Sequence, residues 1–441
     1  MEKAGLKNRG YSRNDVEERR MAAEDFTGSK LDTVSRYAIE PEEASKNIEN
    51  MIGTTQIPLG YAGPVRIDGD SAKGEFLVPL ATTEGALIAS ISRGMSVMNA
   101  GSGVRVAVYA DYMTRAPVLR VDGIDHSKRV CDWIDSHPDE IRKAVESTTS
   151  HGKLHRIDRY PNGRSLHLRF LFETGDAMGM NMATIASEAV CRLLEKETGA
   201  VMISVSGNMC SDKKPAAINL INGRGKTVVA ETTIPRSIVE SKLHTTASAI
   251  AETNYRKNLV GSSMAGTLGA NAHAANMAAA LYIATGQDPA QIVGASMTIT
   301  TCEELDGDLY LCVRMPAVEV GTVGGGTRLP CQGEALDMIG CRGSGNAKKL
   351  AEIVAATVLA GELSTLAAQA AGQLGSAHAA LGRRSASPIV SMGTVRSIGA
   401  TPDSITVFIF GVESPMHACH QFQIQRPLRT HRGRCVPADA G

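Results

Sequence analysis

The sequence has no excess of charge of either sign, and this bounds the partners it can have. Lysine plus arginine number 46, as do aspartate plus glutamate, so the formal net charge at pH 7 is +0. Without surplus positive charge, no global field attracts nucleic acid or acidic lipid. We therefore expect neither a nucleic-acid partner nor a membrane partner, and any cationic binding site must be local.

Paired cysteines are also missing. The nine cysteines are scattered without a Cys-x-x-Cys pair and their number is odd, which favours reduced thiols over a disulfide framework or a zinc ribbon. His417, Cys419 and His420 carry metal-binding side chains, but one short cluster does not make a metal site. We predict no metal site and a cytoplasmic location.

Long apolar runs and the common nucleotide-binding motifs are absent as well. The first residues lack the apolar region of a signal peptide, and no uninterrupted apolar run approaches the ~20 residues of a membrane span. No Gly-x-Gly-x-x-Gly follows a strand-like segment, which disfavours a Rossmann domain. Segment 223–227 mimics the end of a P-loop, but Leu220 occupies the place of its first glycine.

What the chain does contain is a regular alternation of strand and helix in its middle. Its 441 residues suffice for two or three domains with their own cores. The first 50 residues predict short helices after Ser12 and Pro41. The middle of the chain predicts a ferredoxin-like α+β module inserted in a larger domain, with strand 118–121, helix 127–147, strand 166–172, helix 181–197 and strand 201–205.

The loop 205–215 follows an apolar run and then abandons every periodic pattern. Its adjacent lysines, Lys213 and Lys214, repel each other unless an anion or Asp212 lies between them. Pro215 removes a donor and restrains the residue before it. The loop predicts an anion pocket, for instance for a carboxylate, with one lysine left to face a developing oxyanion. From the lysine pair alone, a solvated basic turn is the alternative.

Other candidate positions lie at helix starts and in glycine-rich turns. Segment 82–85 is predicted to open a helix with Glu84 in its first turn, where a carboxylate ordinarily stabilises the helix dipole. Small residues in 175–179 precede a helix whose free N–H groups would suit a phosphate. Glycines 324–326 allow either a close backbone approach to a ligand or a tight turn. His273 is predicted inside helix 272–285, as an interior histidine or a site residue.

The loop and the residues after it read Ser206-Gly-Asn-Met-Cys-Ser-Asp-Lys-Lys-Pro-Ala-Ala-Ile-Asn219. This segment resembles the substrate loop of 3-hydroxy-3-methylglutaryl-CoA (HMG-CoA) reductases. The resemblance covers about residues 5–384. Over this range the chain is similar to the catalytic portion of class I members, without a membrane anchor. Further blocks agree in the same order: Glu49-Asn-Met-Ile-Gly53, Thr82-Thr-Glu-Gly85, Asp176-Ala-Met-Gly-Met-Asn-Met182, Asn271-Ala-His-Ala-Ala-Asn276, Gly286-Gln-Asp288 and Gly321-Thr-Val-Gly-Gly-Gly-Thr327.

The resemblance implies an α+β fold in which a large, helix-rich substrate domain carries an inserted dinucleotide-binding domain. The expected boundaries are a helical segment at 1–48, a discontinuous catalytic domain at 49–115 and 205–384, and the inserted domain at 116–204. Residues 385–441 match nothing in the family and are expected to be an atypical extension, disordered or unrelated.

The resemblance also implies an activity, the NADPH-dependent reduction of HMG-CoA to mevalonate and free coenzyme A. It assigns Lys213 to the reacting carbonyl oxygen, Glu84 to proton donation, Asp288 to a bridge between them, and His378, in a glycine-rich terminal flap, to protonation of the coenzyme A thiolate. The implied substrate-binding residues are Arg115, Ser206, Asp212, Lys214, His273 and Asn276. The implied cofactor-binding residues are Arg93, Asp176, Met178, Gly179, Met180, Asn181, Gly324, Gly325 and Gly326.

Some implied properties have alternatives. Where the family's better-known members read Ser-Arg-Phe for the 2′-phosphate of NADPH, this chain reads Thr149-Ser150-His151, so His151 or Lys153 would have to substitute, and NADH is the second choice of cofactor. The resemblance implies a homodimer or homotetramer with shared active sites. The alternative functions are a reductase of another acyl-CoA or aldehyde, and an inactive dinucleotide-binding homologue.

Overall fold

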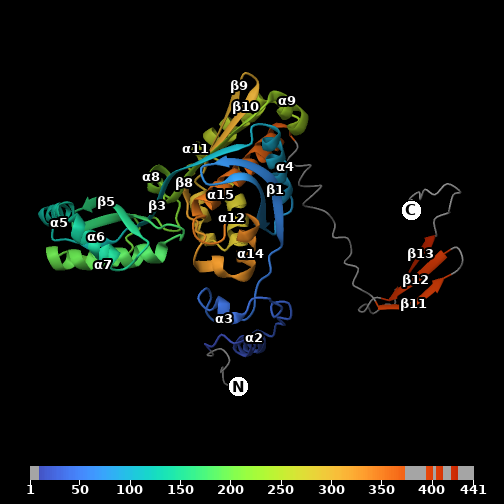
Figure 1. The fold of residues 1–441 in the computed structure, drawn as a ribbon, viewed down its shortest axis with the longest axis horizontal. Coiled ribbons are helices and arrows are strands. Elements are labelled where there is room, and N and C mark those ends of the chain that lie inside the picture. Colours follow the sequence, from blue (N-terminus) through green and yellow to red (C-terminus); the bar gives the residue numbers. More distant parts are fainter. Residues whose placement is uncertain (1–8, 373–393, 401–403, 411–418, 426–441) are drawn as a thin grey trace. The chain divides into compact units, whose positions relative to one another are not determined.

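The computed structural model describes residues 9–372 and the backbone of three later strands, at 394–400, 404–410 and 419–425 (Figure 1). The chain divides into two compact units, Met1–Gly382 and Arg383–Gly441. In the second unit, β11 (Thr394–Ala400), β12 (Ser404–Phe410) and β13 (Cys419–Gln425) form an antiparallel sheet in that order.

The first unit begins with a small helical segment. Helix α2 (Arg13–Thr27) starts at a capping box in which Ser12 and Asp15 satisfy each other's backbone N–H, and ends at Gly28 in the left-handed conformation. Helix α3 (Pro41–Ala44) starts with its proline at the first position. Both pack on a small core of Val16, Ala44 and Met51, so the sequence signals at this end predicted the elements correctly.

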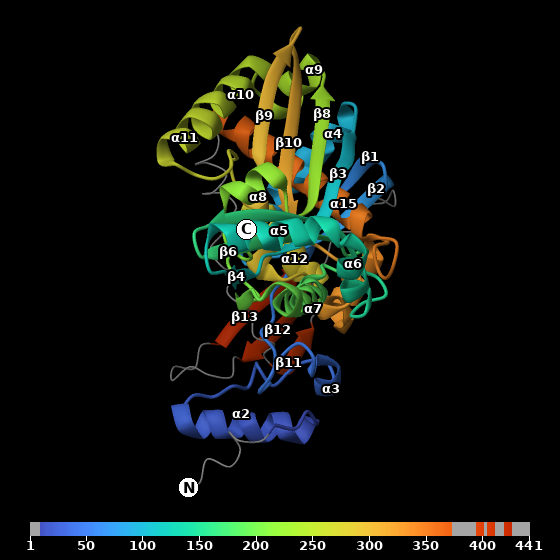
Figure 2. The same cartoon turned by 90° about the vertical axis from the view of Figure 1, so that its left-hand side faces the viewer.

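The large domain is built on a sheet in which distant strands lie side by side (Figure 2). Strand β3 (Val104–Arg115) pairs with β1 in parallel and with β8 in antiparallel, β10 lies between β8 and β9, and β2 closes a hairpin with β1. The other strands are β1 (Leu59–Gly69), β2 (Lys73–Ala81), β8 (Gly225–Ile234), β9 (Ile299–Leu305) and β10 (Asp308–Val318).

Helix α15 (Ala347–Ala370) is the centre of the large domain's core. It packs against α4, α12 and several strands, and at Gly94 of α4 an added Cβ would lie 2.0 Å from the carbonyl oxygen of Ala360. Only glycine permits this approach. By length and composition α15 alone among the described residues could cross a membrane, but 94% of its most apolar stretch is buried within the protein, as in a core helix.

Shorter helices complete the large domain around α15. Their bounds are α4 (Leu87–Ala100), α8 (Ala217–Asn222), α9 (Arg236–Ile238), η1 (Val239–Leu243), α10 (Ala247–Thr253), η2 (Asn254–Gly261), α11 (Ser262–Ala265), α12 (Ala274–Thr285), η3 (Pro289–Gln291), α13 (Ile292–Ala295), η4 (Gly325–Arg328) and α14 (Pro330–Met338).

The inserted domain has the strand order of a ferredoxin-like fold. Its sheet runs β7-β4-β6-β5, all antiparallel, and the helices lie together on it (Figure 1). The predicted α+β class with a ferredoxin-like insert is confirmed. The elements are β4 (Val118–Arg120), α5 (Ile124–Ser136), α6 (Pro138–Glu146), β5 (Lys153–Asn162), β6 (Ser165–Glu173), α7 (Met180–Thr198) and β7 (Val201–Ser204).

Two local predictions in this domain were wrong. The predicted helix 127–147 is interrupted, because Pro138 cannot continue a helix and instead occupies the first position of α6. Strand β5 was missed because it lies at a sheet edge, pairing only with β6, and edge strands carry charged residues that hide their alternation.

Strand β3 joins the two domains. Most of its length pairs with β8 of the large domain, whereas Met113, Thr114 and Arg115 pair with β6 of the inserted domain. The chain returns through the loop after β7, which ends at Ser204. Arg115 and the loop 205–215 therefore lie at the two crossings between the domains.

Candidate active site

The loop 205–215 adopts an unusual backbone conformation. Asn208, Ser211 and Lys213 all have positive φ, at 65°, 49° and 56°, a region that non-glycine residues rarely enter. From α8, the Asn219 amide donates to the carbonyl oxygens of Cys210 and Ser211 at 3.4 Å each. Tertiary contacts therefore hold a backbone that local preference alone would not select.

Asp212 is held from outside the loop. Its Oδ1 accepts hydrogen bonds from Arg224 Nη2 at 2.8 Å and from Gln291 Nε2 at 3.0 Å. Asp212 is thus committed to a partner on each of two other segments. It does not lie between the two lysine ammonium groups as a counterion.

The two lysines of the loop are directed to different partners, which relieves their repulsion. Lys213 Nζ lies 2.9 Å from Asp288 Oδ2, and Lys214 Nζ donates to the main-chain carbonyl oxygen of Asp212 at 3.1 Å. Asp288 caps the short helix η3 through its other oxygen, which accepts from the Ala290 N–H. The Lys213 side chain is 48% exposed and that of Asp288 27%, so the pair is open to a ligand.

Glu84 does not lie in a helix, contrary to the sequence prediction. Helix α4 begins at Leu87, after Ala86 with φ 74°, and Glu84 lies in the preceding turn, where its N–H donates to Thr82 Oγ1. Its Oε2 accepts from Asn276 Nδ2 at 2.8 Å. Among the described residues, Glu84 has neither a hydrogen bond nor an ion pair with Lys213 or Asp288.

His273 also lies outside its predicted helix. It is the N-cap residue of α12, with φ −163° and ψ 40°, because the carboxylate of Glu362 in α15 takes the N–H groups of Ala272 and His273. The imidazole Nε2 lies 2.6 Å from Thr365 Oγ1. One buried helix therefore orients both the start of α12 and this side chain.

A cavity of about 710 Å³ lies beside the Lys213–Asp288 pair, and Asp288 lines its wall. The N-terminus of α7 borders it without a side-chain cap, so unpaired N–H groups are offered to an anion there. At Gly321, an added Cβ would lie 2.5 Å from the Met178 backbone nitrogen. Predicted cofactor residues on the wall are Met178, Gly179, Met180, Asn181, Gly324, Gly325 and Gly326.

Comparison with known families identifies the chain. The model for hydroxymethylglutaryl-coenzyme A reductase matches residues 15–383. The chain belongs to this family.

Curated relatives agree over most of the sequence. The chain is 52% identical over 373 residues to the 3-hydroxy-3-methylglutaryl-coenzyme A reductase of Haloferax volcanii, covering 83% of this chain and 93% of the relative. It is 53% identical over 383 residues to that of Pyrococcus horikoshii, covering 85% and 93%. With reductase 2 of Saccharomyces cerevisiae it shares 49% over 342 residues, covering 75% of this chain but 32% of the yeast protein.

Solved structures agree in fold. The class II reductase of Streptococcus pneumoniae bound to NADPH superposes with a TM-score of 0.62 at 20% identity, covering 80% of this chain and 82% of that one. At this identity the likeness supports the family fold and does not transfer individual residues.

Several residues predicted from the family motifs have structural partners here. The Asp176 carboxylate accepts from the N–H groups of Gly345 and Ala347 at 2.7 and 3.0 Å, at the start of α15. Arg93 donates through Nε to Ser364 Oγ at 3.1 Å, and burial lowers the pKa of its guanidinium. Both are tied to α15 within this chain.

The remaining predicted residues have fewer contacts. Arg115 has a buried Nε without a hydrogen-bond partner among the described residues, and Ser206 Oγ lies 3.9 Å from Cys210 Sγ. His151 is exposed before β5. His378 lies outside the described residues.

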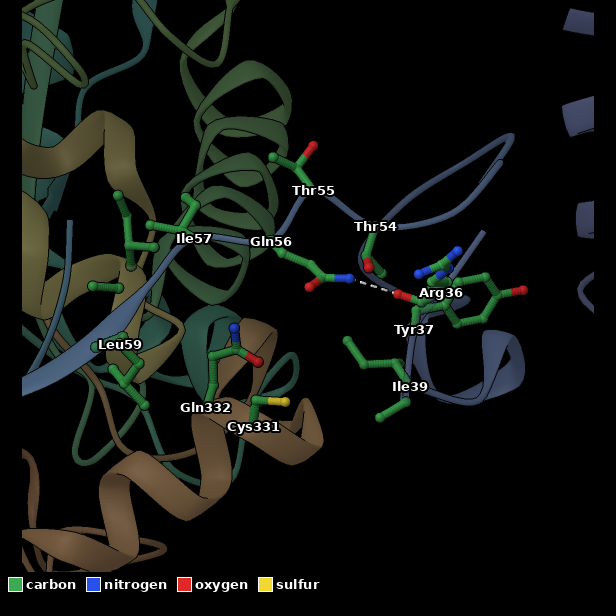
Figure 3. Close-up of a pocket in the computed structure, with 14 residues that line it drawn as sticks. Arg36, Tyr37, Ile39, Thr54, Thr55, Gln56, Ile57, Leu59, Cys331 and Gln332 are labelled. Carbon is green, nitrogen blue, oxygen red and sulfur yellow. Dashed lines mark hydrogen bonds between the residues drawn. The ribbon is translucent and has the colours of Figure 1, made fainter. Parts of the chain in front are cut away.

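A second hollow, of about 520 Å³, lies between the N-terminal segment and the large domain. Figure 3 shows Tyr37 and Ile39 on one side and Cys331 and Gln332 on the other, and Gln56 Nε2 donates to the Arg36 carbonyl oxygen at 2.7 Å. Gln332 lines both hollows, so the two are neighbours on the surface of this reductase family member.

Sequence reasoning missed the residues that hold the loop in place, chiefly Arg224, Gln291 and Glu319. Arg224 was considered only as part of a P-loop, and the structure places 225–227 in strand β8. Glu319 offered a usable signal, since it is a lone charge between apolar residues at the end of a buried strand. Such a charge is buried only with a partner.

Proposed function

We propose that this protein reduces HMG-CoA to mevalonate and free coenzyme A, with NADPH as the reductant, in isoprenoid biosynthesis. Family membership across 15–383 supports the reaction. The single observation that carries the proposal is the Lys213–Asp288 pair, at 2.9 Å, beside a glycine-lined cavity. An ammonium group that a carboxylate holds beside the cavity can stabilise an oxyanion that forms next to it.

The residues of the cavity fit a dinucleotide. The uncapped start of α7 and the glycines 324–326 offer backbone N–H groups and room for a pyrophosphate. Bound NADPH would supply a hydride for each of the two reductions that convert a thioester into an alcohol. NADH remains the second choice of cofactor, because the chain reads Thr149-Ser150-His151 where the 2′-phosphate of NADPH would bind and would need His151 or Lys153 to hold that phosphate.

Each chemical step has a group in this chain. Lys213 would stabilise the developing oxyanion of the thioester and of the aldehyde, with Asp288 holding it in place. Glu84 would donate the proton to the alkoxide, and Asn276 orients it through the 2.8 Å hydrogen bond. His378 would protonate the departing thiolate.

Substrate recognition would use cations and polar groups at the junction of the two domains. Arg115 and Lys214 would pair with the free carboxylate of the substrate, while Ser206, Asp212 and His273 would bind its other polar groups. The buried, unpartnered Nε of Arg115 supports this role, because such donors ordinarily find an acceptor.

We also propose a homodimer or homotetramer in the cytoplasm. Within one chain, Glu84 does not contact the Lys213–Asp288 pair. In a site shared between subunits, the Glu84 of one subunit would lie next to the Lys213–Asp288 pair of another. The burial of α15 in the core supports a protein that does not use this helix to span a membrane.

The test is to follow nicotinamide absorbance with purified protein and HMG-CoA, using NADPH and NADH in parallel. We expect turnover that is faster with NADPH and yields free thiol and mevalonate. No turnover with either cofactor would refute the function. Turnover with another acyl-CoA but not with HMG-CoA would favour a reductase of different substrate range.

A further inference from the structure

Arg224 is the hub of a buried cluster behind the substrate loop. Its Nη2 donates to Asp212 Oδ1 at 2.8 Å, and its Nη1 lies 2.9 Å from both Glu319 Oε1 and Gln291 Oε1. Gln291 closes the circuit by donating to the same Asp212 oxygen at 3.0 Å. Asp212 comes from the loop and Arg224 from the position just before β8, while Gln291 ends η3 and Glu319 follows β10.

A buried cluster of charges is weak evidence of added stability. The side chains of Arg224 and Glu319 are 1% and 2% exposed, and burying charges costs free energy that their attraction often only offsets. Well-packed apolar residues would serve a structural purpose equally well. The cluster does give Asp212 a fixed orientation, because two donors from different elements meet at one of its oxygens.

We propose that Arg224, together with Gln291, is a positioning residue for the reaction and acts through Asp212. By holding that carboxylate, it fixes the strained turn in which the next residue, Lys213, reaches Asp288. The inference rests on the proposed function, since it assigns Asp212 to substrate binding. Arg224 Nη2 also lies 2.8 Å from Met180 Sδ at the start of α7, so this one side chain contacts residues of both proposed binding sites.

Glu319 balances the charge of Arg224 from the side away from the loop. The groups around it are Arg224, Asp212, Gln291 and Tyr282, whose hydroxyl is buried without a partner among the described residues. Burial raises the pKa of Glu319 to about 7, and Arg224 opposes this rise. Glu319 and Asp212 both pair with the guanidinium of Arg224. If either carboxylate loses its charge, Arg224 keeps an ion pair with the other one only.

A double-mutant cycle tests the proposal. We would measure kcat and KM for HMG-CoA in the wild type, Arg224→Lys, Asp212→Asn and the double variant, with thermal unfolding of each. Lysine keeps the charge but cannot reach three acceptors. We expect Arg224→Lys to raise KM for HMG-CoA roughly tenfold or more, the effect of losing a charge-assisted hydrogen bond. The double variant should be no worse than Asp212→Asn alone.

Gln291→Met provides a second measurement if Arg224→Lys does not fold. It removes the other donor to Asp212 without changing any charge, and the same non-additivity with Asp212→Asn is expected. The matched control is Arg19→Lys, a buried arginine of α2 that donates to the Met51 and Gly10 carbonyl oxygens; its KM should equal that of the wild type.

The outcomes separate the two proposals. Additive losses in the cycle, or an unchanged KM in both Arg224→Lys and Gln291→Met, would overturn the positioning role while wild-type turnover of HMG-CoA still stands. Absence of turnover in the wild type would instead defeat the proposed function.

Discussion

Lys213 combines a positive φ with a carboxylate partner, Asp288, that is distant in sequence. Its backbone is left-handed, and its ammonium group lies beside the carboxylate of Asp288, the N-cap residue of η3. A lysine held in this way has a fixed position before the substrate binds, which is what electrostatic stabilisation of an oxyanion needs.

At the residue scale, Lys213→Ala should abolish both reductions. Removing the group that faces the oxyanion should lower kcat on the order of a thousandfold with HMG-CoA and with free mevaldehyde, while the unfolding temperature changes little because the side chain is half exposed. Separate assays with each substrate check this. A variant that still reduces mevaldehyde at the wild-type rate would contradict the role.

His378→Gln should separate the two steps. A residue that only protonates the thiolate is needed for the thioester reduction, so kcat should fall with HMG-CoA and remain near that of the wild type with mevaldehyde. Single-turnover measurements with both substrates compare the steps directly. Equal loss with both substrates would remove this role from His378.

The stability of the protein should also depend on Glu319 and pH. The pKa of this carboxyl is about 7 in the folded chain against 4.5 as its ordinary value, because burial disfavours the charge. The stability that Glu319 contributes through its raised pKa is fully present below pH 4.5, and it is lost as the pH rises through 7 and the buried carboxyl loses its proton. We expect Glu319→Gln to gain stability relative to the wild type between pH 5 and pH 8 by on the order of 3 kcal/mol.

Urea unfolding at several pH values would measure this difference. The sign of the trend does not depend on the constant cost of leaving Arg224 without its partner, because that cost is the same at each pH. A difference that stays flat, or that reverses, would show that Glu319 is charged throughout this range.

At the scale of elements, α15 determines the positions of other parts of the site. Its Glu362 carboxylate accepts from the N–H groups of Ala272 and His273 just before α12, and its Thr365 contacts His273. The N–H of its first residue, Ala347, donates to the Asp176 carboxylate. These contacts explain why α12 begins at Ala274 and not earlier. Helix α15 carries no proposed catalytic group, but it fixes the positions of site residues on the neighbouring elements.

The turn 321–326 should be sensitive to any added side chain. In Gly321→Ala the new Cβ would meet the Met178 backbone nitrogen at 2.5 Å, so this wall of the cavity must shift. We expect KM for NADPH to rise roughly tenfold, since small misplacements of binding groups are costly. Gly123→Ala is the control, because Gly123 has an extended backbone and open space at its Cβ; equal effects in the two variants would contradict this prediction.

At the scale of the whole molecule, the family match ends where the first compact unit ends. The family model covers 15–383 and the unit spans Met1–Gly382. The cavity and the Lys213–Asp288 pair both lie within this unit. The residues beyond it form a unit of their own with strands β11, β12 and β13.

A chain ending at residue 383 should therefore keep its fold and its activity. We expect kcat/KM for HMG-CoA within about twofold of the full chain, and an unchanged main unfolding transition, because few contacts cross such a boundary. Activity assays and thermal unfolding of the two chains provide the comparison. Loss of the main transition would show that residues 384–441 stabilise the catalytic unit.

The sequence by itself determined whatever depends on residues near one another in the chain. The capping box at Ser12, most strands and helices of the ferredoxin-like insert, and the polar loop 205–215 follow from local propensity and pattern, and the family motifs are short continuous segments. The edge strand β5 and the break at Pro138 did not follow from that pattern. The helix starts predicted at 82–85 and at 272 were misplaced, because Ala86 is left-handed and because Glu362 of α15 binds the backbone before α12.

Only the tertiary structure decided which distant groups meet. It directed Lys213 to Asp288, placed Arg224 between Asp212 and Glu319, and buried α15, which by length and composition could cross a membrane, in the core. The reason is physical: a charged group loses its hydration on burial and must find its partner in space, and the chain order does not specify that partner.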